Sequence, residues 1–226
     1  MKEKILPSEG LKLIACLTML IDHMGVALYP RIGLRIIGRI AFPIYCFLLA
    51  EGARHTGNPK KYALRLAIAM VLSELPFDLA VWGGITWEHQ NVLVTLLLGF
   101  GALVTMGQLS SPVGKLAAGI PFMALAWATG CDYGTQGILM VMLFGFAGEY
   151  QWNLGKTALG LALVSLARPS FPVQVLGLSV PIELFSLMAL VPISLYSGKK
   201  ATNSKWVQWG FYLFYPVHLG ILALIA

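Results

Sequence analysis

The chain has 226 residues, of which 58% are hydrophobic and only 12% are charged, and its formal net charge is +6. A soluble globular domain carries roughly 25% charged and 45–50% apolar residues, so this composition excludes an ordinary soluble domain. The apolar residues lie in blocks of about twenty, which as helix are long enough to cross ~30 Å of hydrocarbon. We therefore expect an all-α fold, a polytopic transmembrane helical bundle that forms one domain over residues 1–226.

Hydropathy predicts about nine helices in this bundle. In chain order they lie near residues 11–29, 36–53, 62–83, 90–108, 112–129, 133–149, 155–167, 174–196 and 207–225. The seventh segment is short and ends at Arg168-Pro169, so eight spans and a re-entrant piece are an alternative. The loops are mostly short and rich in Gly, Pro and Ser, and the sequence shows neither a linker to a soluble domain nor an internal repeat.

Basic residues gather on alternate loops and predict the orientation. One side of the membrane receives Lys2, Lys4, Arg54, Lys60, Lys61, Arg65, Lys115, Lys156, Lys199, Lys200 and Lys205. The other side receives Arg31, Arg35 and Arg168, together with the acids Glu88 and Asp132. Because cytoplasmic loops carry an excess of Lys and Arg, we expect a cytoplasmic N-terminus and, with nine spans, an outer C-terminus. This asymmetry explains the net charge without a nucleic-acid partner.

The first predicted helix carries three ionisable residues, Lys12, Asp22 and His23. A charge at the bilayer centre costs roughly 2.5–3.5 kcal/mol, so such residues are functional candidates. Lys12 and His23 are eleven residues apart, which is about 20° beyond three full turns and ~16 Å along the axis. They therefore share a face. A basic group at the cytoplasmic end and an imidazole deeper on the same face suit a long ligand lying along the helix.

The second predicted helix runs back antiparallel to the first, so residues equally far from the turn at Pro30-Arg31 lie at equal depth. Asp22, His23 and Arg39 then form an outer tier. Lys12 and Glu51 form an inner tier. Each tier holds opposite charges, which can neutralise one another in a low dielectric.

Further polar residues fall in the outer half of the later helices or midway along the last one. These residues are Glu74, Asp78, Asn91, Asp132, Tyr133, Glu183 and His218. One interpretation is that they only hold helices together, since polar side chains do so in membranes. A proton-coupled transporter also uses Asp, His and Arg inside the membrane, but repeats or broken helices usually accompany such a site and we find neither. No Cys/His cluster accompanies the histidines, so we expect no metal.

Five stretches, in chain order, resemble the TraX family of membrane proteins. They are KLIACLTMLIDH at 12–23, GRIAFP at 38–43, NVLVTLLLG at 91–99, DYG at 132–134 and FYLFYPVH at 211–218. TraX is known as the enzyme that N-acetylates the F-type conjugative pilin subunit. The family also resembles, distantly, the membrane acyltransferase-three superfamily, which moves acyl groups from cytoplasmic acyl-CoA to acceptors across the bilayer. That superfamily has a basic residue, ten intervening residues and a histidine on its first helix, a spacing that Lys12 and His23 fit.

The resemblance implies an acyl-CoA-dependent acetyltransferase, multi-pass in the bacterial inner membrane, with acetyl-CoA as donor. The CoA phosphates would bind basic side chains at the cytoplasmic mouth. The candidates are Lys12, Arg54, Lys60, Lys61 and Arg65, with no individual roles assigned among the last four.

The catalytic candidates implied by the resemblance are His23, Asp22 and Arg39. His23 would act as general base or accept the acetyl group itself. Asp22 would set the tautomer or charge of a histidine, or pair with Arg39 or His218. Arg39 or Asn91 would stabilise the oxyanion.

The candidates for acceptor binding are Asn91, His218 and Glu51. The acceptor is open: it is an amine or hydroxyl of an envelope component, either a pilin N-terminus or a glycan. The non-enzymatic alternative is a proton-coupled transporter or a pilus-assembly factor built on the same bundle. Acetyl-CoA dependence distinguishes the two classes.

Overall fold

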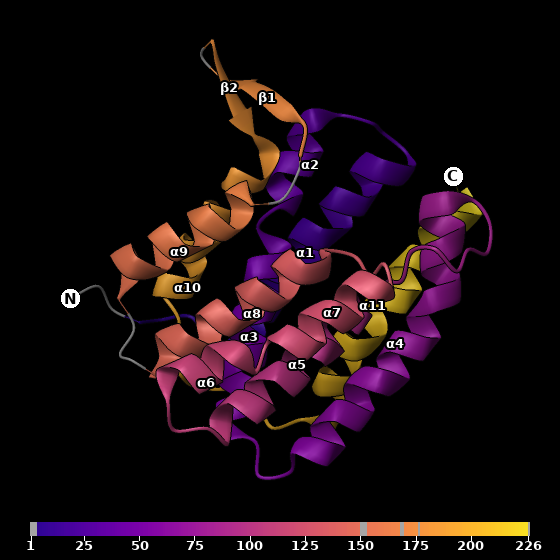
Figure 1. Ribbon diagram of the computed structural model, residues 1–226. Helices are drawn as coiled ribbons and strands as arrows, with labels where there is room; N and C mark the ends of the chain where they lie inside the picture. Colours follow the sequence, from indigo (N-terminus) through magenta and orange to yellow (C-terminus); the bar gives the residue numbers. More distant parts are fainter. Residues whose placement is uncertain (1–3, 150–152, 168–169, 176, 226) are drawn as a thin grey trace.

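In the computed structural model, residues 4–149, 153–167, 170–175 and 177–225 are described, and most of them are helical. The helices are α1 (Ser8–Ala27), α2 (Ile32–Gly38), α3 (Ala41–His55), α4 (Pro59–Trp82), α5 (Val92–Gly107), α6 (Pro112–Ala117), α7 (Ile120–Ala128), α8 (Gly134–Glu149), α9 (Leu154–Leu166), α10 (Leu190–Ser194) and α11 (Lys205–Ile225). A hairpin of β1 (Pro172–Val175) and β2 (Leu178–Pro181) is followed directly by the 3₁₀ helix η1 (Ile182–Ala189) (Figure 1).

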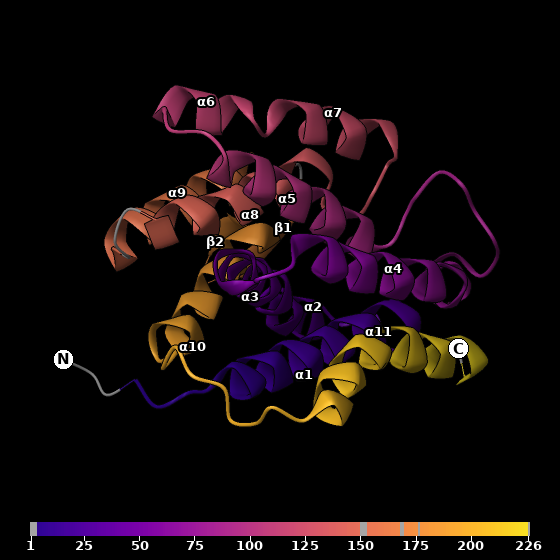
Figure 2. The same cartoon turned by 90° about the horizontal axis from the view of Figure 1, so that it is seen from below.

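The helices form layers. Seen from below, α6 and α7 lie along one side, α1 and α11 along the opposite side, and α3, α5 and α8 between them (Figure 2). The inner layer supplies much of the buried core, including Phe42, Ile44, Ile138 and Phe144. Helices α5 and α8 approach each other closely at Gly99 of α5. A side chain at this position would press against Val141 of α8, so the close contact requires a small residue.

Three stretches of the described chain are long and apolar enough to cross a membrane: α1, α2 with α3 as one unit, and α11. Shorter apolar helices surround them, among them α5 and α9. Helix α4 has the length but carries several charges, and it still exposes large apolar side chains such as Leu64 and Val71. Apolar side chains on the outside are what a lipid environment accepts.

Two predicted helices are each divided in two. The segment predicted at 36–53 forms α2 and α3, which are separated at Arg39-Ile40. The segment predicted at 112–129 forms α6 and α7, which are separated at Ala118-Gly119.

The helix predicted at 174–196 is wrong in its first part, so the described chain is mostly helical with one short β-hairpin rather than entirely helical. Residues 172–175 and 178–181 form two antiparallel strands in which Pro172 pairs with Pro181 and Val175 with Leu178. Hydropathy cannot distinguish a valine-rich strand from a helix, whereas β-branched residues alternating with polar ones favour a strand. Gly177, with a φ of +82°, provides the turn between the two strands.

Candidate functional site

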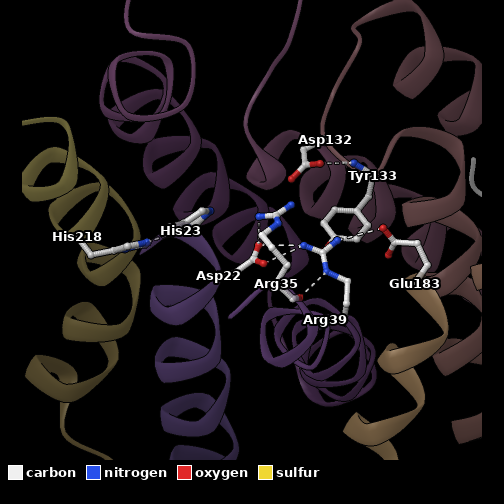
Figure 3. A network of polar contacts seen from close by, with 8 residues as sticks. All are labelled: Asp22, His23, Arg35, Arg39, Asp132, Tyr133, Glu183 and His218. Carbon is white, nitrogen blue, oxygen red and sulfur yellow. Dashed lines mark hydrogen bonds and ion pairs between the residues drawn. The ribbon is translucent and has the colours of Figure 1, made fainter. Parts of the chain in front are cut away.

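A buried ion-pair network joins three separate elements at one end of the bundle (Figure 3). Nη2 of Arg39 lies 3.1 and 3.0 Å from the two carboxylate oxygens of Asp22 on α1. Nη1 of Arg39 lies 3.1 Å from the Glu183 carboxylate on η1, and Nε donates to the carbonyl of Arg35 at 3.3 Å. The predicted pairing of Asp22 with Arg39 is therefore confirmed, and the structure adds Glu183 to it.

The break between α2 and α3 makes this network possible. Arg39 lies at the break, with only 6% of its surface exposed. Gly38, immediately before it, packs directly on the Asp22 side chain, and a Cβ at this position would overlap the Asp22 carboxylate. Glycine thus lets α2 approach α1 closely enough for the carboxylate and the guanidinium to meet.

Two more residues surround the Arg39 guanidinium. The side chain of Arg35, one turn earlier on α2, pairs with the same Asp22 carboxylate at 3.0 Å. Tyr133 places its ring 5.9 Å from the Arg39 guanidinium carbon and stacks on Phe42. Tyr133 also has a φ of +61°, an uncommon conformation for a large side chain. Such strained residues cluster at functional sites.

His23 contacts a different helix from Asp22. Its Nδ1 lies 2.7 Å from Nε2 of His218 on α11, and Nδ1 of His218 lies 2.7 Å from the carbonyl oxygen of Phe214. Adjacent residues on a helix point about 100° apart, so Asp22 faces Arg39 while His23 faces α11. The predicted outer tier is therefore two neighbouring sites, a buried ion-pair network and a histidine pair.

The histidine pair has one tautomer arrangement when both rings are neutral. A carbonyl oxygen only accepts hydrogen bonds, so Nδ1 of His218 must donate to Phe214 and Nε2 of His218 must be the unprotonated nitrogen. Nδ1 of His23 then donates to that nitrogen. This leaves Nε2 of His23 unprotonated, and no hydrogen bond to it occurs among the residues the structure describes. Nε2 of His23 is therefore available to accept a hydrogen bond or a proton.

A cavity of about 580 Å³ connects the two sites. Its lining includes Asp22, His23, Arg35, Arg39, Asp132, Tyr133, Met19, Tyr45, Trp82, His89, Gln90 and Gln136. The hydroxyl of Tyr45 lies 3.2 Å from the Cys16 sulfur. The cavity thus brings together all three catalytic candidates, His23, Asp22 and Arg39.

The three candidates for acceptor binding lie away from the cavity lining. His218 is buried behind His23. Asn91 is completely buried as the N-cap of α5, and its amide donates to the carboxylate of Glu74 and to the Met70 carbonyl. Glu51 lies near the end of α3 that faces away from the cavity, where its carboxylate is engaged as described next.

The predicted inner tier is wrong. Glu51 pairs with Arg54, one turn later on the same helix, and lies 3.7 Å from His55. Lys12 instead lies 5.4 Å from the centre of the Phe211 ring on α11. Two side chains one turn apart on the same helix can pair without any contribution from tertiary structure. This explains why Glu51 pairs with Arg54 and not with Lys12.

The expectation that Lys12 and His23 share a face is confirmed by their contacts with α11, at Phe211 and His218 respectively. Basic residues cluster at the Lys12 end. Arg65 and Lys200 lie within electrostatic range of Lys12, with Glu9 as an acid nearby.

The remaining predicted cofactor residues differ in how far they are already neutralised. Arg65 lies over the Tyr62 ring, and its buried Nε has no hydrogen-bond partner within the described ranges. Lys60 and Lys61 are exposed in the first turn of α4. Arg54, by contrast, is paired with Glu51 and donates to the carbonyl of Gly148 at 2.7 Å.

A comparison with protein families identifies the chain. The family described as TraX protein matches residues 8–226. The chain belongs to the TraX family. It is 31% identical to a probable fimbrial assembly protein, FimC of serogroup H1, from Dichelobacter nodosus, over 94% of this chain and 92% of that one. It is 27% identical to an uncharacterized protein of Rickettsia prowazekii (strain Madrid E), over 95% of this chain and 90% of that one. No solved structure matches the chain.

Sequence reasoning left two residues of this TraX-family site without a role. Arg35 was predicted only as an outer-side charge, although its spacing of four residues from Arg39 was a usable signal. Lys200 was predicted only as an orientation marker, and its approach to Lys12 depends on how α11 packs. Across the described part of the chain, no group of three or more His, Cys, Asp and Glu residues could hold a metal ion.

Proposed function

We propose that this TraX-family protein is a membrane-embedded acetyltransferase that moves an acetyl group from acetyl-CoA to an amine or hydroxyl acceptor. The observation that carries the proposal is the His23–His218 pair, which leaves an unprotonated imidazole nitrogen at a cavity shared with Asp22 and two arginines. General bases of this kind contribute about 10²–10⁴-fold to a rate.

The reaction uses His23 as follows. The acceptor nitrogen or oxygen attacks the thioester carbonyl carbon, and Nε2 of His23 takes the acceptor's proton. When the tetrahedral intermediate collapses, the C–S bond breaks, the electron pair goes to sulfur, and the proton passes from His23 to the CoA thiolate. His218 holds the ring of His23 in the required tautomer by accepting from its Nδ1.

The basic cluster at the Lys12 end is the proposed docking site for the CoA phosphates. Lys12, Arg65 and Lys200 bring like charges together, which an added polyanion would stabilise. Lys60 and Lys61 extend the positive charge at the start of α4. Arg54 is a weaker candidate because its charge is already paired with Glu51.

The donor's acyl end would then travel ~16 Å along α1 to reach His23. The contact between Cys16 and Tyr45 lies on this route, since Tyr45 lines the cavity and Cys16 lies between Lys12 and His23 on the same helix.

The family supports the proposed location and the proposed acceptor. The Lys-rich end would face the cytoplasm, where acetyl-CoA is made, and the cavity would face the outer side of a bacterial inner membrane. TraX membership and the name of the fimbrial relative favour a pilus-related role. The acceptor would accordingly be a pilin N-terminus, with an envelope glycan as the second candidate.

The test uses purified protein in detergent. Binding of acetyl-CoA is measured by calorimetry, and release of the CoA thiol is measured with a thiol-reactive dye, with a short peptide bearing a free N-terminus as acceptor. The variant is His23→Gln, and the matched control is His55→Gln, an exposed histidine outside the cavity.

We expect His23→Gln to bind acetyl-CoA within about threefold of wild type and to lose at least ~100-fold in thiol release, while His55→Gln behaves like wild type. Folded wild-type protein that binds neither acetyl-CoA nor CoA would refute the enzyme and favour the transporter or assembly factor. An active His23→Gln would remove the histidine from the mechanism.

A further inference from the structure

We infer that Arg35, rather than Arg39, is the arginine that contacts the carbonyl oxygen of the acyl group in the cavity. The inference rests on the proposed function and assigns the oxyanion contact within it. Both guanidiniums line the cavity and both pair with Asp22, so the distinction depends on which one has donors to spare.

The donors of Arg39 are almost all engaged. A guanidinium has five N–H groups. Nη2 of Arg39 makes two hydrogen bonds to Asp22, Nη1 makes one to Glu183, and Nε makes one to the Arg35 carbonyl. Its guanidinium carbon also lies 5.9 Å from the centre of the Tyr133 ring. To donate strongly to a substrate oxygen, Arg39 would have to give up a charged partner in a buried setting, and breaking such a pair costs about 3–5 kcal/mol.

Arg35, in contrast, has N–H donors that are not engaged by any residue the structure describes. Its Nη1 lies 3.0 Å from Asp22, and this is the one ion pair it makes among the described residues. Its side chain is 26% exposed, compared with 6% for Arg39. Nε and Nη2 of Arg35 therefore keep their N–H groups for a ligand in the cavity, and the ion pair with Asp22 limits the motion of the head group.

The position of Arg35 suits the acyl oxygen. Its charge, like that of Arg39, lies within electrostatic range of His23. A carbonyl carbon under attack near Nε2 of His23 can therefore have its oxygen directed at the unoccupied N–H groups of Arg35. As the acceptor–carbon bond forms, the C=O electron pair moves onto that oxygen, and Arg35 donates hydrogen bonds to it. The oxygen returns the pair to carbon as the C–S bond breaks. Donors fixed in place before the charge develops are the effective ones.

Arg39 then has a positioning role. It ties Asp22 to Glu183 across α1 and η1, and Asp22 in turn fixes the Arg35 head group. Replacing Arg35 and replacing Arg39 should therefore have different effects. Loss of Arg35 removes a contact made in the transition state, whereas loss of Arg39 loosens the network that holds it.

The experiment compares Arg35→Gln, Arg35→Lys and Arg39→Gln. The control is Arg31→Gln, which replaces an exposed arginine immediately before α2. Acetyl-CoA is the donor and a short peptide with a free N-terminus is the acceptor. Each variant is measured for kcat, for acetyl-CoA Kd and for the melting temperature in detergent.

We expect Arg35→Gln to lower kcat about 10²–10³-fold, while its Kd stays within threefold and its melting temperature within a few degrees of wild type. Arg35→Lys keeps a cation for Asp22 but loses the planar fork, so kcat should fall at least tenfold; this variant decides the matter if Arg35→Gln does not fold. Arg39→Gln should lower the melting temperature most, and Arg31→Gln should match wild type.

Two outcomes overturn the assignment. One is a kcat within threefold of wild type in a folded Arg35→Gln or Arg35→Lys protein. The other is an Arg39→Gln protein that melts like wild type yet loses kcat 100-fold, which would give the contact to Arg39. An active wild type with either result refutes this assignment alone, whereas an inactive wild type that binds no acetyl-CoA refutes the proposed function and this assignment together.

Discussion

The contact between Gly38 and Asp22 gives the sharpest prediction about stability. Gly38 is the buried last residue of α2, and a methyl group there would overlap the Asp22 carboxylate. In Gly38→Ala, Asp22 must therefore move, and its contacts of 3.0–3.1 Å to Arg39 and of 3.0 Å to Arg35 must lengthen.

The size of the effect follows from these contacts. Overpacking a well-packed site costs about 1–3 kcal/mol, and each hydrogen bond to a charged group is worth about 1.5–3 kcal/mol. Alanine in place of glycine returns up to ~1 kcal/mol through helix propensity. We expect a net loss of about 2–5 kcal/mol. At about 2–4 °C per kcal/mol for a chain of this size, the melting temperature should fall by roughly 4–20 °C.

The assay is thermal unfolding in detergent, monitored by tryptophan fluorescence. Gly33→Ala is a matched control, because Gly33 lies on the same short helix with nothing within 4 Å of the added Cβ. It should melt at or slightly above the wild-type temperature. If Gly38→Ala melts no lower than Gly33→Ala, Asp22 does not pack on Gly38 and the reasoning about the network fails.

Three further predictions concern the donor site and the packing. Lys12→Gln and Arg65→Gln should each weaken acetyl-CoA binding, measured by calorimetry, about tenfold, or ~1.4 kcal/mol. Arg54→Gln should change the affinity less than threefold, because the charge of Arg54 is already paired with Glu51. Equal losses in all three variants would contradict the assignment of the phosphate site to the Lys12 end. Raising the salt concentration should weaken acetyl-CoA binding by wild type, and slightly less steeply by Lys12→Gln, which keeps the other cations of the cluster. An unchanged salt dependence would exclude Lys12 from phosphate contact. Asn91→Leu should lower the melting temperature, since it removes the donor from the Glu74 carboxylate and from the Met70 carbonyl, at up to about 1–3 kcal/mol each. An unchanged melting temperature would show that water replaces the amide.

The local periodicity of the sequence predicted part of the site correctly. The face shared by Lys12 and His23 needs only the helical repeat, and the pairing of Asp22 with Arg39 needs only a short antiparallel turn. Neither depends on how distant helices pack. The same reasoning failed for Lys12 and Glu51, because equal depth does not outweigh a partner one turn away such as Arg54.

Other parts of the site depend on long-range packing that a single sequence does not reveal. His218 is 195 residues from His23, and their contact exists because α11 returns to pack beside α1. Glu183 reaches Arg39 because the segment before it forms a hairpin, where hydropathy predicted a helix. Asp22 and His23 are neighbours in sequence, and only the positions of α2 and α11 decide which of them faces which partner.

In the proposed mechanism, donor and acceptor meet at His23 from opposite ends of α1. The direct test seals acetyl-CoA inside proteoliposomes and supplies a peptide with a free N-terminus outside, with peptide acetylation measured by mass spectrometry. We expect acetylated peptide outside vesicles that contain wild-type protein, and none outside vesicles that contain His23→Gln. Acetylation that occurs only when acetyl-CoA and peptide share one compartment would contradict the claim, because both substrates would then enter from the same end.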